Sequence, residues 1–533
     1  MIRVFNYPIH KGKEAAAMKI VEFAQKRNPE QIARKMNSIV GQLKTAVESA
    51  TKGGDSFDSV ERKTLESVLQ IGFQAVELLL ALQGDGDLGE EVLTADRKIA
   101  QRSEATSTTK LRSIFGEHSF EQFTYASGKN KPISLRPISA RLSLPAGRWS
   151  FLLQEFSQML GVDQAYDQAM KNLGVIFGSK FSVDTAERVN GNMGRNAGEF
   201  LDDLPIPEAG SEAKLLVATA DCKGVPLVKD DSEKVAAFET AKKNPGNRRM
   251  ATVTSVYSVD PNVRTAEDIA AALFRDEPDE NADKQPRPKP QNKNTTAHFP
   301  ELAEDGEDGE GGKVSLTGIQ VGLAWLAAQV LARRRPGQVL IMLMDGQESL
   351  WKTMLIHFTF SARTVPILDI LHALAYVWKA ANLFEKDEQA RRSFTRERLL
   401  KILRGEVAGV IQGLRSLGTR RSLKGEKLKT LRQICGYLEK NSDRMRYDEY
   451  LRRGYPIASG VIEGACRHLV KDRMERSGMR WTLEGARSML NVRAAFQSDH
   501  WRTFMNWHIG HEVTQTHPNR HLLQDYNPQT LAC

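Results

Sequence analysis

The chain has 533 residues, of which 41% are hydrophobic and 26% are charged, and its formal net charge is +9. This length is too great for one hydrophobic core and predicts two to four domains. The composition excludes a mainly disordered chain, and the positive charge suits a polyanionic partner where the cations are clustered.

Cysteine usage and apolar runs predict the cellular compartment. The longest apolar run, residues 321–332, is about half as long as a bilayer-spanning helix, and the Met1 end lacks a signal-peptide pattern. No CxxC pair or His/Cys cluster occurs, which argues against a zinc ribbon and a disulfide framework. We therefore expect a cytoplasmic, nucleoid-associated protein with reduced thiols at Cys222, Cys435, Cys466 and Cys533.

The first 205 residues predict three modules. Helical periodicity over residues 60–82 indicates an N-terminal helical region at residues 1–100, and short alternating segments indicate a small β module at 104–145. Residues 146–205 contain three helical segments joined by glycine turns. These segments fit a helix-turn-helix in which Arg188, Asn190 and Arg195 face DNA, or a plain helical bundle with no role in DNA binding.

Residues 210–370 have the pattern of an α/β domain, with two apolar strands that each end on an aspartate. Residues 213–220 predict a buried strand that ends at Asp221, and residues 339–344 predict a second that ends at Asp345. If these strands are neighbours, both carboxylates lie at one edge of the sheet.

Other segments of this domain have clear signatures. Residues 222–228 predict a turn and a strand, residues 250–259 a further strand, and residues 318–334 an amphipathic helix. Residues 276–312 are polar, first proline-rich and then acidic, and this composition predicts a flexible excursion that is dispensable for the fold.

The C-terminal part combines a helical region, a single carboxylate and many cations. Residues 371–453 predict an all-helical insertion, residues 454–507 a return to the core, and residues 508–533 a tail. Gly and Pro turns before residue 460 place Glu463 in the first turn of a helix. Arg467, one turn later, either forms an ordinary ion pair with Glu463 or acts beside it in the reaction. Farther along the helix, a basic stripe either contacts DNA phosphates or is a solvated structural face: Lys471, Arg473, Arg476 and Arg480.

Three acids brought together at neutral pH predict a magnesium site. Asp221, Asp345 and Glu463 would repel one another unless a dication neutralised them, and Mg²⁺ prefers carboxylate oxygens. Two such ions stabilise the attacking and leaving oxygens of phosphoryl transfer. Asp230, Asp231 and Asp260 fit solvated loops better. Asp448 and Glu449 are alternatives to Glu463, but they lack the helix start bounded by Gly and Pro that precedes Glu463.

Four blocks of the sequence carry a family resemblance: TADCKGVPLV, VLIMLMDGQESLW, VPILDILHALAYVWKAA and GYPIASGVIEGACRHLVKDRMERSGMRWTLEGARSMLNVRA. They resemble the DDE transposases of bacterial insertion sequences, in the branch related to Mutator-like elements and closest to the Kra-type family. The similarity covers residues 201–507. It implies an RNase H-like core interrupted by an all-α insertion, with Asp221, Asp345 and Glu463 as the triad. It also marks Asp369 and His372 as a D-x-x-H signature, for which the alternative is a helix N-cap and a core histidine.

The resemblance implies a DNA transposase. Such an enzyme would bind the terminal inverted repeats of its element as a homodimer or higher homo-oligomer. Two Mg²⁺ ions, for which Mn²⁺ would substitute, would support cleavage that frees 3′-OH groups for joining to target DNA. Two alternatives remain at this point: an RNase H-like nuclease or resolvase that cleaves without strand transfer, and a non-catalytic DNA-binding regulator derived from a transposase.

Overall fold

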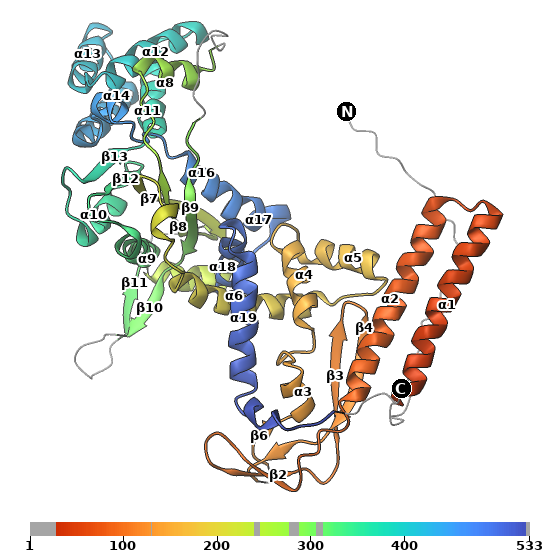
Figure 1. The fold of residues 1–533 in the computed structure, drawn as a ribbon. Coiled ribbons are helices and arrows are strands. Elements are labelled where there is room, and N and C mark those ends of the chain that lie inside the picture. The colour runs from red at the N-terminus through yellow and green to blue at the C-terminus, as the bar shows by residue number, and fades with distance from the viewer. Residues whose placement is uncertain (1–27, 129, 239–245, 277–286, 305–312, 529–533) are drawn as a thin grey trace. The chain divides into compact units, whose positions relative to one another are not determined.

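The computed structural model describes residues 28–128, 130–238, 246–276, 287–304 and 313–528 (Figure 1). Within them the protein is a mixed α/β protein with both parallel and antiparallel strand pairs, as the sequence predicts. The chain forms two compact units, Met1–Leu153 with Glu512–Cys533, and Gln154–His511. The predicted functional residues all belong to the second unit.

The first unit begins with a helical hairpin, α1 (Pro29–Gly53) and α2 (Phe57–Leu82). The side chains of Asn28 and Ser56 cap the two helix N-termini, and Gly54 ends α1 with a φ of 68°, a conformation that glycine adopts without strain. Among the described helices, α2 alone has the length and apolar composition to cross a membrane, although core helices pass the same test.

The β part of the first unit consists of two small sheets. A four-stranded sheet has the order β1-β2-β5-β6, and β3 and β4 form a hairpin. Strands β1 and β2 lie before residue 104, so the region 1–100 is not wholly helical, and residues 137–141 form a helix where an alternating pattern suggested β structure. The bounds are β1 (Glu91–Leu93), β2 (Ile99–Arg102), β3 (Ser107–Ser113), β4 (Gly116–Gln122), β5 (Tyr125–Ala126), β6 (Ile133–Leu135), α3 (Pro137–Arg141) and, near the C-terminus, η5 (Arg520–Leu523).

The second unit is built on a five-stranded sheet with the order β13-β12-β7-β8-β9 (Figure 1). Strands β12 and β13 run parallel to β7, whereas β8 and β9 continue the sheet in antiparallel pairs. Apolar residues on the central strands are fully buried, which explains their continuous hydrophobic runs. The bounds are β7 (Leu215–Pro226), β8 (Arg248–Val259), β9 (Gln291–His298), β12 (Val339–Met344) and β13 (Thr364–Leu368).

Two sequence expectations about this sheet are wrong. Strand β7 does not end at Asp221 but continues to Pro226, paired throughout with β8. The excursion expected at 276–312 contains β9, which lies in the sheet, and β10 (Glu301–Glu304), which pairs with β11 (Lys313–Leu316) just beyond that range. Thr296 is buried, and the hydrogen bond between its hydroxyl and that of Thr254 at 2.7 Å offsets the cost of burying them, so polar composition did not mean exposure. Residues 277–286 and 305–312 lie outside the described residues.

The helices α9 and α18 pack against the sheet, and α6 packs against α18. The helix α9 starts with a capping box formed by Thr317 and Gln320, and α6 crosses α18 so closely that a side chain at Gly194 would collide with Ser488. The bounds are α4 (Phe151–Gly161), α5 (Tyr166–Phe177), α6 (Val183–Asp202), η1 (Ala209–Ser211), α7 (Lys229–Phe238), α8 (Ala266–Phe274), α9 (Gly318–Arg333), α10 (Glu348–His357), α18 (Leu483–Gln497) and α19 (Trp501–Thr516).

Residues 370–452 are helical without a strand, as expected for the predicted insertion. Their apolar residues share one hydrophobic core with β12 and β13, so these helices extend the core of the unit. The bounds are α11 (Ile370–Phe384), α12 (Glu388–Leu403), α13 (Val407–Arg420), α14 (Gly425–Lys440), η2 (Ser442–Arg444) and α15 (Tyr447–Arg452).

Candidate metal centre

The parallel pairing of β7 and β12 brings Asp221 and Asp345 together. Ala220 of β7 pairs with Met344 of β12. Asp221 and Asp345 are the residues that follow these two in the sequence. Adjacent strands lie about 4.8 Å apart. The sequence therefore predicted this pair correctly, although Asp221 lies within its strand and Asp345 follows the end of its own.

Asp345 is held by the turn that follows β12. The backbone N–H of Gln347 donates to its carboxylate at 2.9 Å, and the indole Nε1 of Trp351 donates to its carbonyl oxygen at 2.6 Å. Burial raises the pKa of Asp345, and the negative charges of Asp221 and Asp369 raise it further. The carboxylate is thus fixed in place and repelled by its neighbours.

A second pair of functional groups lies at the start of α11. Asp369 is fully buried and caps the helix by accepting from the N–H of Leu371 at 3.0 Å. It also accepts from Ser459, through the hydroxyl at 2.6 Å and the backbone N–H at 3.2 Å, and contacts Nδ1 of His372 at 2.8 Å. Asp369 is therefore both an N-cap and the group that orients His372.

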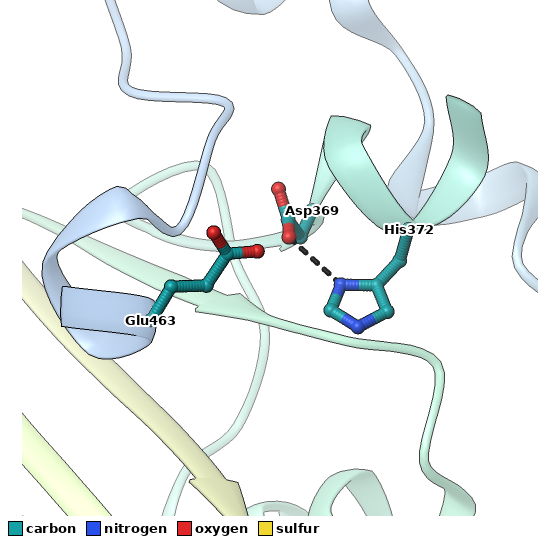
Figure 2. A group of neighbouring side chains, drawn as sticks. All are labelled: Asp369, His372 and Glu463. Atoms are coloured by element: carbon teal, nitrogen blue, oxygen red, sulfur yellow. Dashed lines mark hydrogen bonds and ion pairs between the residues drawn. The ribbon is translucent and has the colours of Figure 1, made fainter. Parts of the chain in front are cut away.

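Glu463 reaches the same place from a different helix. It lies in the first turn of α16 (Gly460–Ala465), as predicted, and its carboxylate faces Asp369 (Figure 2). Ligand atoms of Asp369, His372 and Glu463 all lie within 4.8 Å of one another. Burial raises the pKa of Glu463, and the charges of Asp369 and Asp221 add to that effect.

The charges gathered at this place fit a divalent cation. The residues concerned are Asp221, Asp345, Asp369, His372 and Glu463. The pKa of His372 is raised, first by its hydrogen bond to Asp369 and then by the charges of Asp369, Asp345 and Asp221. Mutual repulsion among these clustered carboxylates, from the buried Asp369 to the exposed Glu463, is relieved by a bound cation, and oxygen donors suit Mg²⁺ or Mn²⁺. Because His372 uses Nδ1 toward Asp369, it would offer Nε2 to a metal.

Three residues near the acids were missed by sequence reasoning. The thiol of Cys466 donates to Asp221 at 3.4 Å, and Ser459 holds Asp369. Tyr437, from α14, packs so closely on Gly346 that any side chain there would collide with its ring, and it stacks on Tyr376 at 3.7 Å. A signal in the sequence existed only for the contact of Tyr437, namely the glycine at position 346 directly after Asp345, because glycine permits such a close approach.

The basic stripe expected beyond Glu463 is not formed. The helix changes geometry after α16 into a π-helical turn, η3 (Cys466–Lys471), and then α17 (Asp472–Met474) and a 3₁₀ turn, η4 (Arg476–Gly478). Arg473 is completely buried, donates from Nε to the carbonyl of Gly161 at 2.8 Å, and lies over the rings of Tyr166 and Trp481. Its assignment to DNA binding is therefore wrong, because no phosphate reaches it.

The other predicted cations of this segment are exposed. Lys471 and Arg476 line a hollow of about 560 Å³ together with Asp163, Asp472 and Glu475, and Arg480 also faces solvent. Arg467 forms a long ion pair with Asp472, with Nε 3.9 Å from the carboxylate, and within the described residues it forms no ion pair with Glu463. The simple i,i+4 pair is thus not observed, and a role in DNA binding stays a prediction for the exposed residues.

On α6, Arg188 and Arg195 are exposed, seven residues apart. Asn190 is buried and donates to Gln158 at 3.0 Å, so its expected place toward DNA is wrong.

The alternative acids have structural partners or face solvent. Asp231 accepts from the N–H of Leu483 at 2.8 Å, in the helix α7 rather than a turn. Asp448 and Glu449 form ion pairs with arginines of their own segment. Asp230 and Asp260 are exposed.

Removing one acid should stabilise the metal-free protein. The raised pKa of Asp345 means that its ionised form destabilises the fold at neutral pH, a cost that disappears as the pH falls through the raised value. We expect Asp345→Asn to melt at a higher temperature than the unmodified protein in EDTA at pH 7, with a smaller difference at low pH. Calorimetry or thermal circular dichroism measures this, and a lower melting temperature would show that Asp345 stabilises the fold instead.

A comparison with the models of known protein families found no match to this chain, and a search of curated proteins found none either.

Proposed function

We propose that the chain is a DDE-type DNA transposase with an RNase H-like core. It binds element ends as a homo-oligomer, cleaves DNA to free 3′-OH groups, and joins them to target DNA. The observation that carries the proposal is the convergence of Asp221, Asp345 and Glu463, from two adjacent strands and a helix, on the pair Asp369 and His372.

The order of the elements supports the proposal. The chain delivers the first acid on the central strand, the second after the adjacent parallel strand, and the third on a helix after an all-helical segment. This is the order that the resemblance to DDE transposases implies. The resemblance of the four blocks and this spatial convergence both support the proposal.

The residues have distinct roles in this proposal. Asp221, Asp345 and Glu463 would hold two Mg²⁺ ions, for which Mn²⁺ substitutes. When bound, such ions supply activation of water and stabilisation of the leaving oxygen. Asp369 holds His372 in orientation and ties α11 to Ser459, which precedes the Glu463 helix. The turn bonds from Gln347 and Trp351 keep Asp345 directed at the cluster.

Two alternative functions differ in whether they use the acidic cluster. A nuclease or resolvase would use these carboxylates without strand transfer. A regulator derived from a transposase would bind DNA without them, and the presence of all three acids at one place argues against it.

The direct test is an assay on supercoiled plasmid and on a duplex with the inverted repeats that flank the gene. We expect nicking with Mg²⁺ or Mn²⁺, none in EDTA, and covalent joining of the freed 3′ ends to the plasmid. Nicking without joining would favour the nuclease. Binding without nicking under any metal condition would overturn the enzymatic proposal.

A further inference from the structure

A continuous groove runs along the side of α16 that is turned away from Glu463. Two hollows, of about 910 and 510 Å³, share Lys289, Pro290, Gly460 and Val461 as lining residues. Because the helix advances about 100° per residue, the residues 460, 461, 464 and 465 that line the groove are centred roughly 130° from Glu463. We call this feature the basic groove.

One wall of the basic groove is the segment that leads into β9. Pro288 and Pro290 flank Lys289, and proline favours an extended backbone that keeps neighbouring side chains apart. Arg287, Lys289 and Lys293 are exposed there. The composition of this segment predicted a flexible excursion, but residues between 287 and 295 form a defined wall of the groove.

The charge of the basic groove is unbalanced. Arg264 and the three cations of the wall line it, whereas the lining carboxylates are Asp260 and Asp499. In the described part of the chain, no ion pair joins Arg287, Lys289 or Lys293 to a carboxylate. The hollow beside Lys471 and Arg476 differs, because three acids neutralise those two cations. The basic groove is thus the better site for a polyanion.

Two glycines form the floor of the basic groove. A Cβ atom on Gly460 would meet nothing within 4 Å, and one on Gly464 would meet only the ring of His468 at 4.0 Å. Neither glycine has a positive φ, so backbone conformation does not require it, and glycine weakens a helix relative to alanine. Their effect is an open floor that a ligand backbone can approach closely.

We propose that the basic groove binds the sugar-phosphate backbone of a nucleic-acid strand, with phosphates on Lys289 and Lys293 and the backbone against Gly464. The proposal rests on the proposed function, since it is the neighbouring acidic cluster that favours a nucleic acid over an acidic peptide. The strand in this groove is a flanking segment on the other side of the Glu463 helix from the reacting phosphate.

The test measures binding of a fluorescein-labelled 30-base-pair DNA duplex and the matching single strand by the full chain, without divalent metal, over a range of salt concentrations. Lys289→Glu with Lys293→Glu should weaken binding at least tenfold and lower the salt dependence by about two units of slope. Lys229→Glu, at half the charge change of the double variant, is the control for charge reversal at a lysine outside the groove, since Lys229 is 83% exposed. It should bind nearly as the unmodified protein does.

Two substitutions of Gly464 distinguish a blocked groove from a misfolded protein. Gly464→Leu should weaken binding with the melting temperature unchanged or raised, whereas Gly464→Ala should raise the melting temperature and bind almost normally. Wild-type binding by Gly464→Leu and by the double lysine variant would overturn the inference. So would displacement of the DNA by polyglutamate at equal charge and lower concentration, which would point to an acidic protein.

The two proposals fail in distinguishable ways. Metal-dependent nicking that is lost in Asp345→Asn, with groove variants that bind normally, rejects the basic groove alone. Binding that depends on the groove, in a protein that never nicks DNA, supports the groove and rejects the enzymatic proposal.

Discussion

Asp345→Asn and Glu463→Gln should each lower metal-dependent DNA nicking by about a thousandfold or more, because each change removes a carboxylate from a cluster that acts as a unit. DNA binding should be unchanged or tighter, since fewer negative charges repel phosphate. Asp221→Asn should behave in the same way. Single-turnover nicking of supercoiled plasmid, beside binding measured without metal, gives both quantities.

Asp448→Asn is the matched control for these variants. Asp448 was an alternative to Glu463 in the sequence, and its carboxylate pairs with Arg452 at 3.0 Å on a helix surface. It should nick DNA at the normal rate. If Glu463→Gln retained near-normal nicking, Glu463 would be excluded from the centre, and Asp369 with His372 would have to act without it.

Arg473→Ala should cost about 2–4 kcal/mol of unfolding free energy, because it leaves a cavity and removes the cation from between Tyr166 and Trp481. Burial lowers the pKa of Arg473 to about 10, so its desolvated charge is held by these rings and by the carbonyl of Gly161. Denaturant unfolding measures the loss. The salt dependence of DNA binding by the folded fraction should not change.

Arg480→Ala provides the comparison, since Arg480 is exposed on the same segment. It should change stability by less than about 0.5 kcal/mol, and if Arg480 contacts a phosphate it should lower the salt slope by about one unit. A stable Arg473→Ala protein with a reduced salt slope would contradict the burial of Arg473 and restore the basic stripe.

The pair Asp221 and Asp345 could be predicted from the sequence because apolar runs identify buried strands and the aspartates interrupt them. The prediction also assumed that the two strands are neighbours, and β7 and β12 are indeed paired in parallel. Glu463 was placed in a first helical turn by its Gly and Pro neighbours, a local signal. The positions of these three acids were therefore predictable, because they depend only on local sequence patterns and on one strand pairing.

The remaining features depend on contacts between distant parts of the chain. Ser459 and Asp369 are 90 residues apart, and neither has a local pattern that announces their hydrogen bonds. Arg473 looked exposed because an uninterrupted helix would place it on a basic face, but the π-helical turn rotates it into the core. Strand β9 was missed because its threonines, Thr295 and Thr296, are buried by pairing their hydroxyls with those of Ser255 and Thr254 on the neighbouring strand β8, which no local pattern reveals.

The most direct test of the central claim is the binding of Mn²⁺ to the full chain, measured by calorimetry and by electron paramagnetic resonance without DNA. The acidic cluster predicts saturable binding that Asp345→Asn and Glu463→Gln each weaken at least tenfold, whereas Asp448→Asn leaves it unchanged. Equal Mn²⁺ binding by all four proteins would contradict a metal centre at these carboxylates.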